Sequence, residues 1–207
     1  DWKKNMKHLS KSIRAIHFVV LAFLMTLSSP VVGQDFDKGW AAYEAGDYGA
    51  ALKEWQPLAE AGNAEAQYAI GKLYHSGKGV TRDYNKAVKW YALAAEKGNT
   101  DAQVTLGVLY KVGLGVPYDP KEAIKWLKLA TEQGNAIAQH SLAGMYRTGR
   151  GVLKDNIMAH MWYSIAASNG ENAGGRRRDD LAKNMTTEDI SKAQAMAREC
   201  MSSSYTK

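Results

Sequence analysis

Cysteine and proline are scarce in this sequence. A single cysteine, Cys200, occurs among 207 residues, so an intramolecular disulfide and a cysteine-based zinc site are both excluded. Only 4 prolines accompany 19 glycines, a balance that favours helices ended by glycine caps over a proline-rich linker. Hydrophobic residues make up 45% and charged residues 23% of the chain, as in ordinary globular proteins. This composition excludes a disordered tail, a collagen-like chain and a multi-span membrane protein.

The sequence also lacks a basic domain surface, although its net charge is +6. Residues 1–33 hold five basic side chains and one acidic side chain, and the rest of the chain holds 22 basic and 20 acidic side chains. This near-balance does not supply the basic face that nucleic acids require, so no nucleic-acid partner is expected. The one local basic cluster, Arg176–Arg178, is followed at once by Asp179 and Asp180. We interpret it as a solvated helix face, with a docking patch as the alternative.

The first 33 residues have the layout of a secretory signal. The segment Lys7–Arg14 is basic, and the ten residues Phe18–Leu27 are apolar except for one threonine. Small residues follow as far as Gly33. A bilayer span needs about 20 apolar residues, twice the length of this run. We therefore predict a cleavable signal cut after Gly33, a periplasmic or secreted protein, and membrane contact only through the signal. An uncleaved anchor is the alternative.

A 36-residue repeat organises the centre of the chain, in copies at 64–99, 100–135 and 136–171. The copies align without insertion. The shared residues are mostly alanine, glycine, tyrosine and tryptophan: Ala66, Ala102, Ala138; Tyr74, Tyr110, Tyr146; Gly77, Gly113, Gly149; Ala87, Ala123, Ala159; Trp90, Trp126, Trp162. A single such unit cannot bury its apolar face alone, so stacked units are required.

Each copy predicts two helices. Asn63, Asn99 and Asn135 are suited to cap the first helix, and Gly77 and its equivalents to end it. The second helix is expected to start at Asp83, Asp119 or Asp155 and to end near Gly98, Gly134 or Gly170. Residues 34–63 read as a shortened front unit, and residues 172–207 as a polar closing pair of helices with a tail. Within that pair, Ile190, Ala193, Ala197 and Cys200 form the expected inner stripe.

The pattern Ala-Gln-x-x-x-Gly-x-Leu-Tyr-x-x-Gly-x-Gly-Val-x-x-Asp-x-x-Lys-Ala-x-x-Trp-Tyr, read from residues 66–91, resembles the Sel1-like repeat, a relative of the tetratricopeptide repeat. The resemblance covers about residues 35–200, and the front unit is closer to the tetratricopeptide form. It implies an all-α superhelix, or solenoid, of stacked antiparallel helix pairs that holds other proteins or peptides. It also implies an exported bacterial type, with roles in envelope signalling, exopolysaccharide control or host interaction. Ala143 and Leu127 depart from the pattern, since Gly71 and Tyr91 occupy the equivalent positions.

The resemblance also indicates where a partner would bind, because the first helix of each pair lines the concave face in tetratricopeptide-like stacks. With Gly71 as the packing glycine, the outward residues vary among copies while the packing residues do not. They predict a groove for an extended or helical peptide with some acidic character. An ordinary solvated face is the alternative. The predicted binding residues are Trp40, Tyr43, Tyr68, Lys72, His75, Val104, Val108, Lys111, His140 and Arg147.

Catalytic motifs are missing. Beyond residue 33 the only histidines are His75, His140 and His160, and no metalloprotease, nucleophile-elbow or phosphate-loop pattern occurs. We predict a monomeric, non-enzymatic scaffold with a protein or peptide partner and no cofactor. An envelope hydrolase acting on cell-wall fragments or β-lactams, a secreted host-interaction factor, and a metal pair of His140 with His160 are the alternatives.

Overall fold

The computed structural model describes residues 35–203, and every regular element within that range is an α-helix. The predicted secretory signal at 1–33 lies outside the described residues. None of the described helices is both long and apolar enough to cross a bilayer. The helices are α2 (Phe36–Glu44), α3 (Tyr48–Glu60), α4 (Ala64–Ser76), α5 (Tyr84–Glu96), α6 (Thr100–Val112), α7 (Pro120–Glu132), α8 (Ala136–Thr148), α9 (Asn156–Ser168), α10 (Asn172–Ala182) and α11 (Thr187–Ser202).

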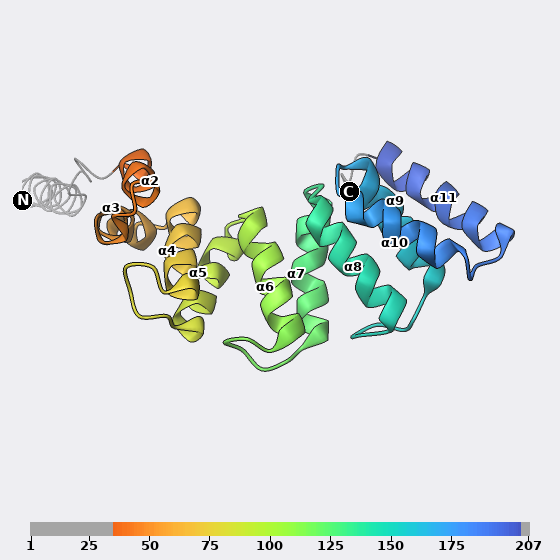
Figure 1. Cartoon of the computed structure of the whole chain (residues 1–207), viewed down its shortest axis with the longest axis horizontal. Helices are drawn as coiled ribbons and strands as arrows, with labels where there is room; N and C mark the ends of the chain where they lie inside the picture. Colours follow the sequence, from red (N-terminus) through yellow and green to blue (C-terminus); the bar gives the residue numbers. More distant parts are fainter. Residues whose placement is uncertain (1–34, 204–207) are drawn as a thin grey trace, which may run out of the picture. The chain divides into compact units, whose positions relative to one another are not determined.

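Helix pairs follow one another in chain order (Figure 1). Helices α4 and α5, α6 and α7, and α8 and α9 each form a hairpin, and the second helix of each hairpin packs on the first helix of the next. Helices α2 and α3 form a shorter hairpin at the front. The predicted all-α solenoid of stacked antiparallel helix pairs is confirmed.

The predicted caps form. The side chains of Asn63, Asn99 and Asn135 each accept a hydrogen bond from the backbone N–H three residues on, at 2.8, 2.9 and 2.9 Å. The first helix of each repeat ends at a glycine with a left-handed backbone, such as Gly77 with a φ of 74°. Such a conformation is strained for residues with a Cβ, which explains the repeated glycine.

Close helix contact at Gly71 explains the packing within a hairpin. A Cβ on Gly71 would lie 2.6 Å from the ring of Tyr91, so only glycine allows α4 and α5 to approach this closely. Tyr91 is buried against small residues such as Ala87 and Ala94. The neighbouring Trp90 is half-buried and packs against the preceding hydrophobic cluster between α3 and α4. Tyr91 thus fills the space within the first repeat, as Leu127 does against Gly107 in the second, and Trp90 packs on the preceding cluster.

The closing helices do not repeat this pairing, because α11 packs on α9. Ala193 and Ala197 of the predicted inner stripe are buried there with Met161 and Ile165 of α9. The positions equivalent to Met161 in the other repeats are Lys89 and Lys125, both exposed. The outer face of α9 is therefore apolar where α5 and α7 are charged, and burial of that apolar face favours the contact with α11.

Candidate functional site

Four of the ten predicted binding residues form an aromatic cluster around one lysine. The Nζ atom of Lys72 lies 5.5 Å from the ring centre of Trp40 and 5.7 Å from those of Tyr43 and Tyr68. Trp40 and Tyr43 stack with their ring centres 5.4 Å apart. These residues come from α2 and α4, so the front unit and the first repeat contribute to one surface.

A second lysine, Lys78, which is not among the predicted binding residues, extends this cluster. Lys78 lies 5.0 Å from the ring centres of both Tyr43 and Tyr48, and its ammonium donates a hydrogen bond of 3.2 Å to the Tyr43 hydroxyl. These hydroxyl contacts raise the pKa of Lys78. Lys78 stands between two turn glycines, where the repeat alignment suggests a connecting loop rather than a binding residue.

The three predicted binding residues in the middle of the face, His75, Val104 and Val108, are less accessible to a partner. His75 is half-buried, with its Nδ1 atom 3.3 Å from the Tyr91 hydroxyl and its ring edge against Tyr84. Val104 is half-buried against the hydrophobic cluster between α7 and α8, and Val108 is also half-buried. His75 and Val104 therefore contribute to packing between helices as well as to the face.

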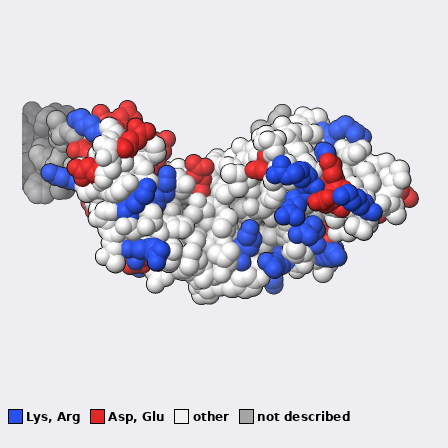
Figure 2. Space-filling model, viewed as in Figure 1, with Lys and Arg blue, Asp and Glu red and all other residues white. Residues whose placement is uncertain are grey.

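The remaining three predicted residues, Lys111, His140 and Arg147, line one cavity of about 230 Å³. Arg150 and Arg177, which are not among the predicted binding residues, line it as well. The other lining residues are Ser141, Gly144, Met145, Thr148 and Tyr163. The cavity is built by α6, α8 with its following loop, α9 and α10. Lys and Arg side chains gather over α8 and α10, beside a smaller acidic group (Figure 2).

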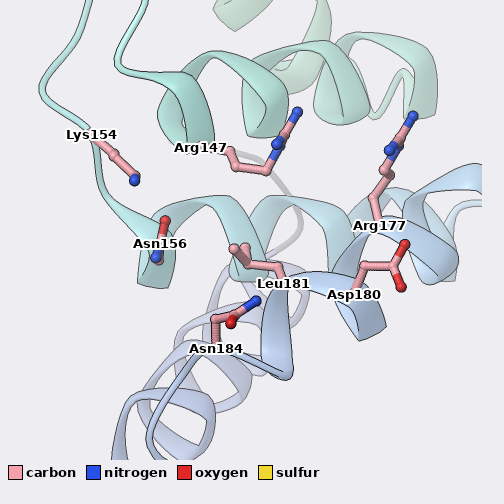
Figure 3. Close-up of a pocket in the computed structure, with 7 residues that line it drawn as sticks. All are labelled: Arg147, Lys154, Asn156, Arg177, Asp180, Leu181 and Asn184. Atoms are coloured by element: carbon pink, nitrogen blue, oxygen red, sulfur yellow. The ribbon is translucent and has the colours of Figure 1, made fainter.

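An adjoining cavity of about 330 Å³ shares Arg147 and Arg177 with the first (Figure 3). Lys154 enters it from the loop after α8, and Asn156 from the first turn of α9. Its remaining lining residues, on or after α10, are Asp180, Leu181 and Asn184. The two cavities share these two arginines and together hold five cationic side chains and one acidic side chain, Asp180.

Burial and like charge shape the electrostatics of the first cavity. Burial lowers the pKa of Lys111, and Arg150 adds to that effect. Burial also lowers the pKa of His140, with Arg177 and Lys111 in the same direction and Glu171 opposing them. The ring of His140 lies edge-on to Tyr163, with ring centres 5.3 Å apart. An anion placed here would favour the protonated form of both groups.

The three arginines at 176–178 have different surroundings in the structure, and only Arg177 lines the two cavities. Arg178 pairs with Asp179 at 2.7 Å, and Asp180 pairs with Lys183 at 2.9 Å. Neither aspartate forms an ion pair with Arg177, although the pKa of Asp180 is lowered by the hydrogen bond from Lys183 and also by the charge of Arg177. A helical spacing of four places Arg177 on the face of Leu181, which packs against the cluster of Tyr163. This spacing of four from an apolar residue is the feature of the sequence that could have singled out Arg177.

A metal site has no support among residues 35–203, where no group of three or more His, Cys, Asp or Glu side chains is placed to hold an ion. His160, one member of the alternative metal pair, lies on α9, and its side chain is buried, with 1% exposed. Cys200 is free and half-buried, and burial raises the pKa of its thiol.

Comparison with known proteins identifies the repeat. The Sel1 repeat model matches residues 64–99, 100–135 and 136–171. The crystal structure of a Sel1 repeat protein from Oxalobacter formigenes is 28% identical, with a TM-score of 0.69 over 80% of this chain and 75% of that chain. No curated protein matched.

A second solved structure is that of c5321, a protective antigen present in uropathogenic Escherichia coli strains that displays an SLR fold. It is 40% identical, with a TM-score of 0.64. The match covers 67% of this chain but only 31% of c5321, so this chain spans under a third of that protein's length. Because the three matched repeats cover more than half of the sequence, the chain belongs to the Sel1 repeat family.

Proposed function

We propose that this protein is a non-enzymatic, exported scaffold that binds a polypeptide along the face formed by the first helix of each pair. Sel1 repeats generally mediate protein–protein interactions and are generally non-catalytic. The observation that carries the proposal is the grouping of seven of the ten predicted residues into two clusters on that face. One cluster is aromatic, around Lys72, and the other is cationic, around Arg147.

The two clusters offer the kinds of contact that hold protein partners. Trp, Tyr and Arg are the residues most enriched at interface positions where truncation is costly. Trp40 is 39% exposed, and Arg147 is exposed. A partner that spans both clusters would place apolar or aromatic side chains near the front unit and acidic side chains near α8. Envelope signalling or regulation is the setting we propose for this contact.

Partner capture tests the proposal. Tagged processed protein is used to recover partners from envelope extracts, in parallel with the triple variant Tyr68→Ala, Lys72→Ala, Lys111→Ala. The control is Lys89→Ala with Lys128→Ala, which removes two exposed lysines from the second helices α5 and α7. We expect partners that the wild type and the control recover and the triple variant loses. Equal recovery by all three proteins would contradict binding on this face.

Export is tested separately, by fractionation and N-terminal sequencing of the natural protein. We expect a periplasmic or secreted protein that starts at Gln34 or a near neighbour. A full-length protein that stays in the cytoplasm would contradict the proposal of export.

A further inference from the structure

The cavity of about 230 Å³ gathers four cationic side chains and no acidic one. Lys111 comes from α6, Arg147 from α8, Arg150 from the loop after α8, and Arg177 from α10. Three segments that are distant in sequence thus converge on one small volume. Like charges brought together repel one another, so this arrangement lowers the stability of the empty site.

None of these four cations forms an ion pair within the described part of the chain. The ion pairs found between residues 35 and 203 are Lys86–Asp83, Lys125–Glu122, Arg178–Asp179 and Lys183–Asp180, and they include none of the four. The front of the molecule differs, because Lys72, Lys78 and Arg82 there lie over aromatic rings. Lys111, Arg147 and Arg150 are therefore available to an external anion, while Asp180 offsets part of the charge of Arg177.

His140 adds a polar side chain to the lining of the cavity. The Nδ1 atom of His140 is buried and has no hydrogen-bond partner, and buried polar atoms without partners are costly. His140 lines the same cavity as the four cations. In the adjoining cavity, Lys154 adds a further positive charge.

The geometry points to an acidic segment of a partner polypeptide as the ligand, with its Asp or Glu carboxylates held by Arg147 and Arg177. Guanidinium groups match carboxylates by paired hydrogen bonds, and these two arginines line both cavities. A peptide fits better than a nucleic acid, because the cationic side chains are confined to these two small cavities, whereas a nucleic acid needs an extended basic face, and residues 34–207 hold 22 basic and 20 acidic side chains. This inference rests on the proposed scaffold function and specifies the chemistry of its partner.

Peptide binding measured by fluorescence anisotropy tests the inference. The probe is a labelled decapeptide in which Glu alternates with Ala, and the matched probe carries Gln in place of every Glu. The variant is Arg147→Gln with Arg177→Gln. The control is Arg176→Gln, which removes an exposed arginine of the same helix that lines neither cavity. Circular dichroism melts check that each variant is folded.

We expect the wild type and Arg176→Gln to prefer the Glu probe, and the double variant to bind it at least about tenfold more weakly, because hydrogen bonds to charged groups are lost. The charge-reversed pair Arg147→Glu, Arg177→Glu should instead prefer a Lys-Ala decapeptide. Equal affinity of the wild type for the Glu and Gln probes, or unchanged binding by the double variant, would overturn the inference.

Two further measurements test whether a nucleic acid or a second copy of this chain binds at the site instead. Equal binding of a single-stranded oligonucleotide would indicate a general polyanion site and overturn the choice of a peptide. A dimer in light scattering that the double variant abolishes would assign the site to a second copy of this chain. If the double variant captures the same envelope partner as the wild type, this inference fails while the scaffold function stands. If no partner is recovered by any protein, the scaffold function fails, whatever the peptide result.

Discussion

Replacing His160 by valine should stabilise this protein. The side chain of His160 is 1% exposed, and its Nδ1 atom is buried without a hydrogen-bond partner. The equivalent positions in the other repeats are Val88 and Ile124, both buried, so an aliphatic side chain suits this part of the repeat. An unpaired buried polar atom costs about 1–3 kcal/mol. We expect His160→Val to raise the free energy of unfolding by about 1–2 kcal/mol at pH 7.5.

The gain should grow as the pH falls. Burial lowers the pKa of His160 in the folded protein, with Arg178 adding to the effect and Asp179 opposing it. The unfolded chain then binds more protons than the folded chain below a pH of about 6.5, so the wild type loses stability there. The limit for one such group is about 1.4 kcal/mol per pH unit. His160→Val lacks this pH-dependent loss of stability. The pKa of His140 is also lowered, but His140 is present in both proteins and so does not change the difference between them.

Urea unfolding followed by circular dichroism at pH 7.5, 6.5 and 5.5 measures both effects. The control is His75→Gln, because His75 is half-buried and has the Tyr91 hydroxyl as a partner. Its replacement should give no stabilisation. A His160→Val protein that is less stable than the wild type at pH 7.5, or a stability difference that does not change with pH, would refute the reasoning.

Two further predictions concern packing, and thermal and urea unfolding measure both. Gly71→Ala should lower stability by about 1–3 kcal/mol, because the new Cβ would meet the Tyr91 ring at 2.6 Å. Gly144→Ala, whose Cβ would have no neighbour closer than 3.7 Å, should raise stability by about 0.5–1 kcal/mol; equal effects of the two would contradict this account of the helix contact. Ile165→Ala, beneath α11, should cost about 2–4 kcal/mol, and Leu129→Ala at the equivalent repeat position, 42% exposed, under about 1 kcal/mol. Similar losses in both would show that α11 does not cover α9 in solution.

The cationic cavity shows the limit of sequence reasoning about the site. Lys111, His140 and Arg147 were predictable because the repeat places them at outward positions of the first helices. Arg150 lies between the turn glycines of the third repeat, at the position of Lys78 and Leu114, where the copies share no residue type. Arg177 lies in α10, outside the repeats. Arg150 follows Arg147 by only three residues, whereas the approach of Arg177 to Arg147 depends on how α10 packs on α9. The aromatic cluster was predictable in part, since Lys78 joins it from a loop whose path the alignment does not describe.

By itself, the sequence determined the local structure of this protein and the order of its units. Asparagine and aspartate caps, turn glycines and alanine positions act through contacts close in the chain, so three aligned copies are enough to specify three hairpins. Only the tertiary structure decided how α11 lies on α9, which lysines are covered by aromatic rings, and which arginines remain unpaired. These outcomes depend on contacts between segments far apart in the chain, where the burial of apolar faces and the balance of charges act on the folded molecule as a whole.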